Sequence, residues 1–269
     1  MIGFANCKIN LGLNVIAKRD DGYHEVEMGM YPVSSFYDVV EIVDNDNGGL
    51  EYTSSGIAID CPPEKNLCVR AYKAIAKRYK LGGVKMHLHK AVPFGGGLGG
   101  GSSDAVTVMK LLNNKFSLDI GTEEMEEIAG ELGSDTVFFV KNIPALATDR
   151  GECLTPISVD LGGYYITIVL PPVSVSTAEA YSAIVPFRHE IPVADVLKMG
   201  VREWRHYLVN DFERTVFRKF PQLQDIKETL YARGATYASM SGSGSAVYGL
   251  FGSPPNLQGI FQNFVVFKL

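Results

Sequence analysis

The chain has 269 residues, of which 46% are hydrophobic and 20% are charged, and its formal net charge is −5 at pH 7. This small negative charge does not favour nucleic-acid binding, and no apolar run approaches the roughly 20 residues of a membrane span. The first residues lack the layout of a signal peptide, so we expect a cytoplasmic protein of one large or, as we favour, two modest domains.

The first element is predicted to be a strand. Residues 3–15 mix apolar with small polar side chains, as a strand does when it leads into a cleft. Lys8 stands there between two apolar neighbours, and a lysine that is buried without a partner is costly. Its ammonium is therefore expected to reach either solvent, as on an edge strand, or an anion.

The segment 18–25 is polar and contains a glycine, which predicts a turn after the first strand. One interpretation is a solvated hairpin turn. The other is a recognition loop, in which Tyr23 offers a stacking face and His24 a directional hydrogen bond. Two strands are then predicted over 37–43 and 50–57, because both alternate and a polar, glycine-containing turn separates them.

A helix and a strand lead to the middle of the chain. Apolar residues recur at helical spacing over 66–79, and a pair of glycines ends that helix. The strand predicted over 84–90 carries His87 and His89 on one polar face, where a zinc site is a remote alternative. The cysteines form no C-x-x-C pair, and reduced thiols are expected at all of them: Cys7, Cys61, Cys68 and Cys153.

The stretch from Pro93 to Asp104 places six glycines and two serines between a predicted strand and a predicted helix. Glycines allow positive φ and close backbone approach, so successive N–H groups can turn toward phosphate oxygens, and the following helix adds the positive end of its dipole. The alternative is a flexible surface loop. The stretch lacks the lysine of a P-loop, and any polyglycine run would match the dinucleotide fingerprint as well. We therefore interpret it as a phosphate cradle of another kind.

Two helices are predicted after this loop. The first covers 104–116, with Ser102 or Ser103 as its cap, which would give these hydroxyls a structural role in place of a catalytic one. The second covers 122–132, with Thr122 as its cap.

Asp135 enters an apolar run directly after the second helix. A buried aspartate needs a partner, and a carboxylate–lysine pair is a common one, for which Lys8 is the obvious candidate. The alternative is that Asp135 caps a helix.

An apolar strand predicted over 164–170 begins a second domain, which divides the chain into 1–162 and 163–269. The segments 235–240 and 245–251 are predicted strands around a small glycine loop, which has the position to close over phosphates held by the first loop. The last residues, 252–269, have room for one short helix and a final strand. Trp204 is expected to anchor a core, and short helices are predicted around 178–184, 193–199, 203–219 and 223–232.

Three motifs, in this order, resemble those of the GHMP kinase superfamily: the strand with Lys8, the glycine loop that ends in two serines, and the C-terminal Ser-Gly-Ser-Gly turn. Within it, the chain is most similar to the family of kinases that act on 4-diphosphocytidyl-2-C-methyl-D-erythritol. That similarity rests on Lys-Ile-Asn-Leu at 8–11, Asp-Gly-Tyr-His-Glu at 21–25, Asn-Leu at 66–67 and Leu-Gly-Ser-Asp at 132–135.

The resemblance implies a two-domain α+β fold, with an N-terminal nucleotide-binding domain that is ribosomal protein S5 domain 2-like and a ferredoxin-like C-terminal domain. It also implies ATP-dependent phosphorylation, with Mg²⁺, of the tertiary 2-hydroxyl of the methylerythritol moiety in the non-mevalonate isoprenoid pathway. Phosphoryl transfer needs placement and charge stabilisation more than covalent help, so a cradle, a base and a lysine are a sufficient set.

The resemblance further implies roles for single residues. Asp135 would be the general base, and Lys8 would hold it ionised and steady the charge at the attacking oxygen. Asp149 stands where the family usually has a glycine. Substrate contacts are implied for Asn10, which would orient the acceptor, for Tyr23, His24 and Tyr181 around the cytosine, and for Thr177. ATP contacts are implied for Asn66, Leu67, Lys90, Pro93, Gly95, Gly96, Gly97, Leu98, Gly99, Gly100, Gly101, Ser102, Ser103, Ser241, Gly242, Ser243 and Gly244, and the magnesium ligands are left unassigned.

Three other functions stay open at this point. The nearest is a GHMP kinase for another small alcohol, such as a mevalonate or sugar kinase. A second is a nucleotide-binding regulator that has lost catalysis, against which the presence of both Lys8 and Asp135 argues. A dinucleotide-dependent oxidoreductase is a distant third.

Overall fold

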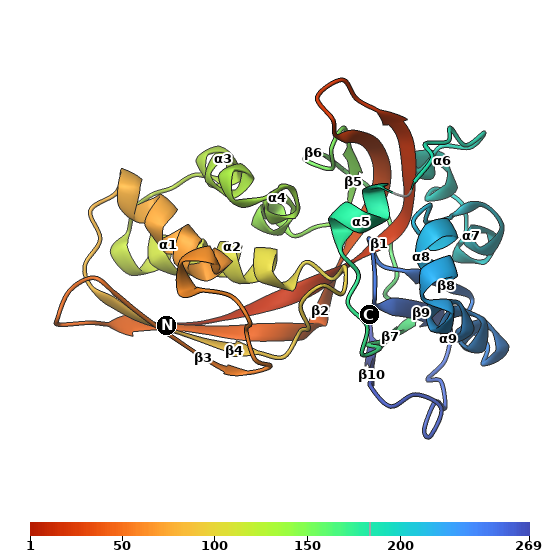
Figure 1. Cartoon of the computed structure of the whole chain (residues 1–269). Helices are drawn as coiled ribbons and strands as arrows, with labels where there is room; N and C mark the ends of the chain where they lie inside the picture. Colours follow the sequence, from red (N-terminus) through yellow and green to blue (C-terminus); the bar gives the residue numbers. More distant parts are fainter. Residues whose placement is uncertain (183) are drawn as a thin grey trace. The chain divides into compact units, whose positions relative to one another are not determined.

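The computed structural model describes residues 1–182 and 184–269, which form two compact units (Figure 1). Neither unit is a continuous half of the chain, because the strands β1 (Ile2–Lys18) and β2 (His24–Asp44) each contribute residues to both. The domain boundary between 162 and 163 stays a prediction. Unit 1 comprises Met1–Cys7, Phe36–Pro93 and Gly99–Ile143, and unit 2 comprises Lys8–Ser35, Phe94–Leu98 and Pro144–Leu269.

Unit 1 is a sheet with helices on one side (Figure 1). The end of β2 pairs antiparallel with β4 (Val84–Lys90), and β4 pairs in parallel with β3 (Leu50–Gly56). Every second residue of β4 is buried, because one face of the sheet packs on helices while the other faces solvent. The covering helices are α1 (Leu67–Arg78), which the short 3₁₀ turn η1 (Pro63–Lys65) precedes, α2 (Gly100–Phe116), α3 (Thr122–Leu132) and α4 (Ser134–Lys141).

Most of the predicted elements of unit 1 are confirmed. The strand over 84–90 has the predicted bounds, and the helix over 66–79 is α1. Asn66 caps this helix, since its Oδ1 accepts a 2.8 Å hydrogen bond from the amide of Cys68. The helix ends at Arg78, before the glycine pair. The strand predicted over 37–43 begins much earlier, at His24.

The predicted side-chain caps of the other helices are wrong. Gly99 is the residue before α2 and has a φ of 67°, in the left-handed region that favours glycine, so the helix begins at Gly100. Ser102 and Ser103 lie inside its first turn and cap nothing. The residue before α3 is a glycine as well, which makes Thr122 the first helical residue. Asp135 is in the first turn of α4, where the helix dipole favours a negative charge, and does not cap that helix.

Unit 2 contains two groups of paired strands. In the first, residues 28–30 of β2 pair with β5 (Ala145–Thr148), and β5 pairs with β6 (Cys153–Pro156). In the second, an antiparallel sheet has the order β10 (Phe264–Lys268), β7 (Tyr165–Val169), β9 (Val247–Phe251) and β8 (Tyr237–Met240). Counted along the chain this order is 4-1-3-2, which is the ferredoxin-like order that the resemblance implied.

The connection between β9 and β10 differs from the prediction. The final strand is confirmed as β10, but residues 252–263 form turns in place of a short helix. Pro254 and Pro255 disfavour a helix before them, because proline clashes with a preceding helical turn, and Gly259 interrupts the residues after them with a φ of 74°.

The helices of unit 2 all lie between β7 and β8 in the chain. The single helix predicted over 203–219 is wrong, because residues 208–212 are not helical. Within them, residues 209–211 pair with β1. The amide of Asp211 donates to Leu13 at 2.8 Å, and its carboxylate accepts from the amide of Val15 at 2.9 Å. Trp204 is confirmed as a core anchor at 1% exposure. Residue 183, inside the helix predicted over 178–184, lies outside the described residues. The observed helices are α5 (Thr177–Ser182), α6 (Val193–Val196), α7 (Val201–Tyr207), α8 (Glu213–Lys219) and α9 (Pro221–Ala232).

Candidate functional site

Two glycine-containing loops are in contact within unit 2. One is the first part of the predicted phosphate cradle, residues 94–98, and the other connects β8 to β9. Three hydrogen bonds join them: Ser245 N to Gly95 O at 3.2 Å, Ala246 N to Gly96 O at 3.2 Å, and Ser241 Oγ to Gly97 O at 2.8 Å. The two loops are therefore in direct contact, and closure of the second loop over phosphates stays a prediction.

Gly97 shows how close this approach is. Its φ is +71°, and a Cβ at this position would lie 1.8 Å from the carbonyl oxygen of Ser241. Only a residue without a side chain fits there. At the neighbouring Gly96, the nearest atom to a Cβ would be 3.6 Å away, which is ordinary contact. The glycines of this loop are therefore not equivalent.

The second part of the predicted cradle belongs to unit 1 and forms the start of α2. Because the first amides of a helix have no partner inside it, the N–H groups after Gly99 are available to an anion at the positive end of the helix dipole. The amide of Ser103 donates to Gly99 O at 3.0 Å and closes the first turn. This geometry suits the predicted binding of phosphate oxygens.

Lys8 and Asn10 form a buried pair on β1. The Lys8 ammonium donates a 2.6 Å hydrogen bond to Oδ1 of Asn10, and Lys8 is only 2% exposed. Its predicted alternative, a lysine that reaches solvent on an edge strand, is therefore wrong. The backbone of Asn10 is held by two hydroxyls, since its amide donates to Ser241 Oγ at 3.1 Å and its carbonyl accepts from Tyr248 at 2.8 Å. The amide of Lys8 also donates to Leu98 O at 2.9 Å, so this strand contacts both loops.

Asp135 is half-buried in the first turn of α4, in unit 1. Lys8 is in unit 2, and the pairing of these two residues stays a prediction.

The predicted cytosine contacts surround the turn between β1 and β2. The imidazole of His24 stacks on the ring of Tyr181 at a centroid distance of 5.0 Å, and the rings of Tyr181 and Phe212 lie nearly perpendicular with their centroids 4.8 Å apart. Tyr23 is 58% exposed, and the guanidinium of Arg150 lies 5.2 Å from its ring centroid. Burial lowers the pKa of His24, and the charge of Lys18 lowers it further. A neutral imidazole can both donate and accept a hydrogen bond, which suits recognition of a base.

Thr177 and Asp149 also belong to unit 2. The hydroxyl of Thr177, at the start of α5, is 3.0 Å from the hydroxyl of Ser243 in the second glycine loop. Asp149 has a φ of 58°, so its backbone adopts the conformation that a glycine would adopt without strain. Its carboxylate is 3.4 Å from the guanidinium of Arg19.

The predicted adenine contacts in unit 1 are engaged with other protein groups. Asn66 uses its side chain to cap α1 and to donate to the hydroxyl of Tyr52 at 3.1 Å. The side chain of Lys90 has no exposed surface and pairs with Asp38 and Asp104. Its ammonium is thus closed to a nucleotide, and an ATP contact at this position would have to use its backbone. Sequence reasoning missed this pairing, although an aspartate inside a predicted apolar strand, at position 38, was a signal for it.

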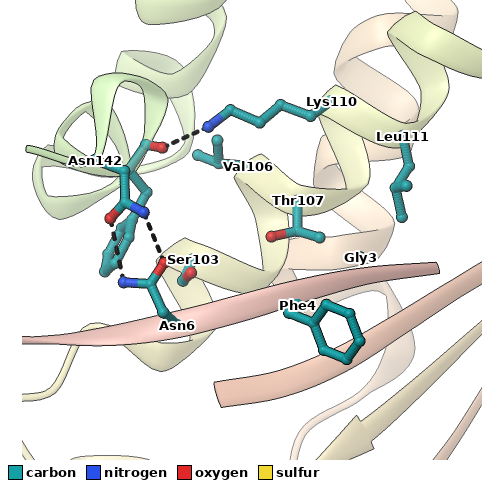
Figure 2. Close-up of a pocket in the computed structure, with 10 residues that line it drawn as sticks. Gly3, Phe4, Asn6, Ser103, Val106, Thr107, Lys110, Leu111 and Asn142 are labelled. Carbon is teal, nitrogen blue, oxygen red and sulfur yellow. Dashed lines mark hydrogen bonds between the residues drawn. The ribbon is translucent and has the colours of Figure 1, made fainter. Parts of the chain in front are cut away.

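A cavity of about 190 Å³ in unit 1 also went unpredicted (Figure 2). It lies between β1, α2 and the end of α4, and Ser103 is its one residue from the predicted sites. Asn6 and Asn142 exchange hydrogen bonds through their side-chain amides at 3.2 and 2.7 Å, and Lys110 donates to the carbonyl of Phe139 at 2.9 Å. Desolvation lowers the pKa of Lys110. The polar groups drawn in Figure 2 therefore mostly satisfy one another.

Among residues 1–182 and 184–269, no group of three or more His, Cys, Asp or Glu side chains has the arrangement of a metal site. Within the same residues, no helix has the length and apolar character needed to cross a membrane. Among the described residues, none of the four cysteines is part of a disulfide.

Two family models match this chain. The model of the GHMP kinases N terminal domain matches residues 66–142, and that of the GHMP kinases C terminal matches residues 194–264. Together they cover more than half of the chain.

Curated relatives and solved structures match nearly the whole chain. A 4-diphosphocytidyl-2-C-methyl-D-erythritol kinase of Parabacteroides distasonis is 47% identical, over 96% of this chain and 94% of its own. Its counterpart in Cytophaga hutchinsonii is 45% identical, over 95% and 94%. A crystal structure of 4-(cytidine 5'-diphospho)-2C-methyl-D-erythritol kinase has a TM-score of 0.80 at 32% identity and covers 93% and 90% of the two chains. The mevalonate kinase of Methanococcus jannaschii shares the fold, with a TM-score of 0.72 at 13% identity over 99% and 96%.

Proposed function

We propose that this chain, which belongs to the GHMP kinase family, transfers the γ-phosphoryl group of ATP to the 2-hydroxyl of 4-diphosphocytidyl-2-C-methyl-D-erythritol. The products would be the 2-phosphate and ADP. The observation that carries the choice of acceptor is the 47% identity to a kinase named for this substrate, over 96% of the chain. The match to mevalonate kinase, at 13% identity, supports the fold alone.

The contact between the two glycine loops supports ATP as the donor. Gly97 packs so closely on Ser241 that a side chain would not fit between them. The amides that begin α2 have no partner inside the helix. We propose that these loops hold the phosphates of ATP. Magnesium would neutralise charge on the same phosphates, and its ligands on this chain are unassigned.

The proposed chemistry needs one base and one cation. Asp135 would accept the proton of the attacking hydroxyl, and Lys8 would stabilise the negative charge that develops on that oxygen. Asn10 would orient the acceptor, because both its backbone groups and its Oδ1 are fixed by hydrogen bonds. The role of the protein is then placement and electrostatics, as phosphoryl transfer requires.

The substrate would be chosen by its base. We propose that the neutral imidazole of His24 hydrogen-bonds to the cytosine, that the rings of Tyr23 and Tyr181 flank it, and that Thr177 makes a further polar contact. The exposed ring of Tyr23 is available for stacking, whereas one face of Tyr181 is covered by His24 in this structure. We keep the cytoplasmic location as part of the proposal, because the enzyme would draw on the ATP of the cell.

A coupled ADP-release assay tests the proposed function. Purified protein is incubated with ATP, Mg²⁺ and one acceptor at a time: the diphosphocytidyl compound, mevalonate, homoserine or a hexose. We expect ADP release with the diphosphocytidyl compound and inhibition by cytidine diphosphate. Faster turnover of another acceptor would overturn the choice of substrate, and ADP release with none of them would overturn the assignment as an active kinase.

The base assignment has its own test. Asp135→Asn should abolish transfer while an ATP analogue still binds, because the amide cannot accept the proton. Asp119→Asn is the matched control, since Asp119 also belongs to unit 1 and its φ of 60° is one that asparagine tolerates. Near-normal turnover in Asp135→Asn would contradict the role of Asp135.

A further inference from the structure

Unit 1 contains three ionisable side chains that are almost completely shielded from solvent. The exposed fractions of the Lys90, Asp38 and Asp104 side chains are 0%, 0% and 2%. The Lys90 ammonium donates to Oδ2 of Asp104 at 2.9 Å and also to the carboxylate of Asp38. One lysine is thus shared by two aspartates, in an arrangement that we call the Lys90 cluster.

The Lys90 cluster holds the chain directly before the glycine loop. Oδ1 of Asp38 accepts hydrogen bonds from the backbone amides of Ala91, at 2.6 Å, and of Val92, at 2.8 Å. These are the last residues before Pro93. A carboxylate that accepts two successive amides fixes the direction in which the backbone leaves β4.

The same cluster holds the chain directly after the loop. Asp104 lies on the first turns of α2, and its link to Lys90 ties the start of this helix to the end of β4. The first residue of α2 packs on the ammonium itself, since a Cβ at Gly100 would lie 2.9 Å from Nζ of Lys90. The residues directly before and directly after the loop are therefore both held by the Lys90 cluster.

Burial of a lysine with two carboxyl groups is an expensive way to stabilise a fold, because the desolvation cost offsets much of the attraction. Well-packed apolar side chains of similar volume often stabilise a fold equally well or better. The polar groups add a defined orientation of the backbone. Oδ2 of Asp38 accepts from the Lys90 ammonium, and Oδ1 accepts from the two amides that lead into the loop.

We propose that Asp38, Lys90 and Asp104 are positioning residues that hold the two ends of the glycine loop together, so that the first amides of α2 are preset for the phosphates of ATP. This inference rests on the proposed function, and it extends it to residues that would not touch the nucleotide. The predicted nucleotide role of Lys90 becomes an indirect one, exerted through the backbone at both ends of the loop.

The two aspartates of the cluster differ in their ionisation and in their partners. Burial raises the pKa of Asp104 to about 8 against the opposing effect of Lys90, and the neighbouring carboxylate of Asp38 raises it as well. The carboxylate of Asp38 accepts hydrogen bonds from three donors. Asp104 accepts one from Lys90 at Oδ2, and its Oδ1 has no hydrogen-bond partner among the described residues. The other titratable groups that face Asp104 are Cys68 of α1 and Tyr52 of β3.

Two substitutions at Asp104 separate positioning from packing. Asp104→Ala removes the oxygen that holds Lys90, and we expect the KM for ATP to rise about tenfold, the size of one lost charge-assisted hydrogen bond. The kcat at saturating ATP and the KM for the acceptor should stay within about threefold, since the cluster acts on the loop alone. Asp104→Asn keeps an oxygen for Lys90 and should restore the KM for ATP to within about threefold of the wild type.

Leu112→Ala is the matched control, because Leu112 is fully buried on the same helix, eight residues after Asp104. It should lower the melting temperature and leave the KM for ATP unchanged. A KM for ATP within twofold of wild type in Asp104→Ala, or an equal rise in Leu112→Ala, would overturn the positioning role.

If Asp104→Ala does not fold, Asp38→Asn provides the same test, because its amide nitrogen would face the Lys90 ammonium while its oxygen still serves the backbone. An unchanged KM for ATP in that variant counts against the inference. The proposed function is tested separately by wild-type turnover: a wild type that releases ADP normally, beside variants with unchanged ATP kinetics, overturns this inference alone.

Discussion

The ammonium of Lys8 donates a 2.6 Å hydrogen bond to Oδ1 of Asn10, inside a part of β1 where both residues are buried. The same asparagine is held through its backbone by Ser241 and Tyr248. The position of a buried cation is thus linked to the second glycine loop through a chain of hydrogen bonds within unit 2.

Replacement of Lys8 by methionine tests whether this cation serves the chemical step. Lys8→Met keeps most of the side-chain volume and removes the charge, so kcat should fall about 100-fold or more while the KM for ATP changes little. Steady-state kinetics with each substrate varied in turn measure both parameters. Asn10→Ala is the companion variant and should raise the KM for the acceptor more than that for ATP. A Lys8→Met protein with wild-type kcat would show that the lysine has a structural role only.

The contact between Gly97 and Ser241 predicts different tolerances at two adjacent glycines. Gly97→Ala places a Cβ 1.8 Å from a carbonyl oxygen at a φ of +71°, and should lower the free energy of unfolding by about 2–4 kcal/mol. Gly96→Ala has its nearest contact at 3.6 Å and should change that free energy by less than about 0.5 kcal/mol. Urea unfolding of both variants, with ATP-analogue binding as a second readout, decides the matter. Equal stability of the two variants would argue against the loop contact.

The lowered pKa of His24 predicts a pH profile for the acceptor. The folded protein favours the neutral imidazole, so its pKa lies below the ordinary value of 6.5. The stabilisation by this group is present above pH 6.5 and is lost as the pH falls below it. We expect kcat/KM for the acceptor to show no His24 inflection from pH 8 down to 6.5 and to fall only below that value.

Titration of the His24 ring by NMR, compared with the kinetic profile, measures this behaviour. The exposed His206 supplies the control, and His206→Gln should leave the profile unchanged. An inflection that belongs to His24 above pH 7 would contradict the prediction.

Thr167 offers a prediction on stability alone. It lies on β7 at 0% exposure, and among the described residues its hydroxyl has no hydrogen-bond partner. Valine has nearly the same shape, so Thr167→Val should raise the free energy of unfolding by about 1 kcal/mol, since no buried hydroxyl is left unpaired. Ser239→Ala on strand β8 of the same sheet should do the opposite, because that hydroxyl donates to Glu213 at 3.1 Å. Chemical denaturation of both proteins provides the comparison.

Local sequence patterns predicted the elements whose reasons are local. The strand over 84–90 alternates along its whole length, and the α1 cap depends on one asparagine two residues before the amide that it binds. By contrast, the helix predicted over 203–219 is interrupted because Asp211 bonds to a strand almost 200 positions away in the chain, and no helical periodicity contains that contact. The caps predicted at Ser102 or Ser103 and at Thr122 are wrong because the preceding glycines Gly99 and Gly121 occupy the cap positions.

By itself, the sequence determined the family, the glycine loop and the identity of the residues proposed for catalysis, because these depend on residue type and short spacings. The tertiary structure decided what those residues meet. It placed the first glycine loop against Ser241, buried Lys8 on Asn10, and enclosed Lys90 between two aspartates. The loop contact and the Lys90–Asp38 pair depend on which distant segments the fold brings within about 3 Å of each other, and the burial of the local Lys8–Asn10 pair depends on what packs around its strand.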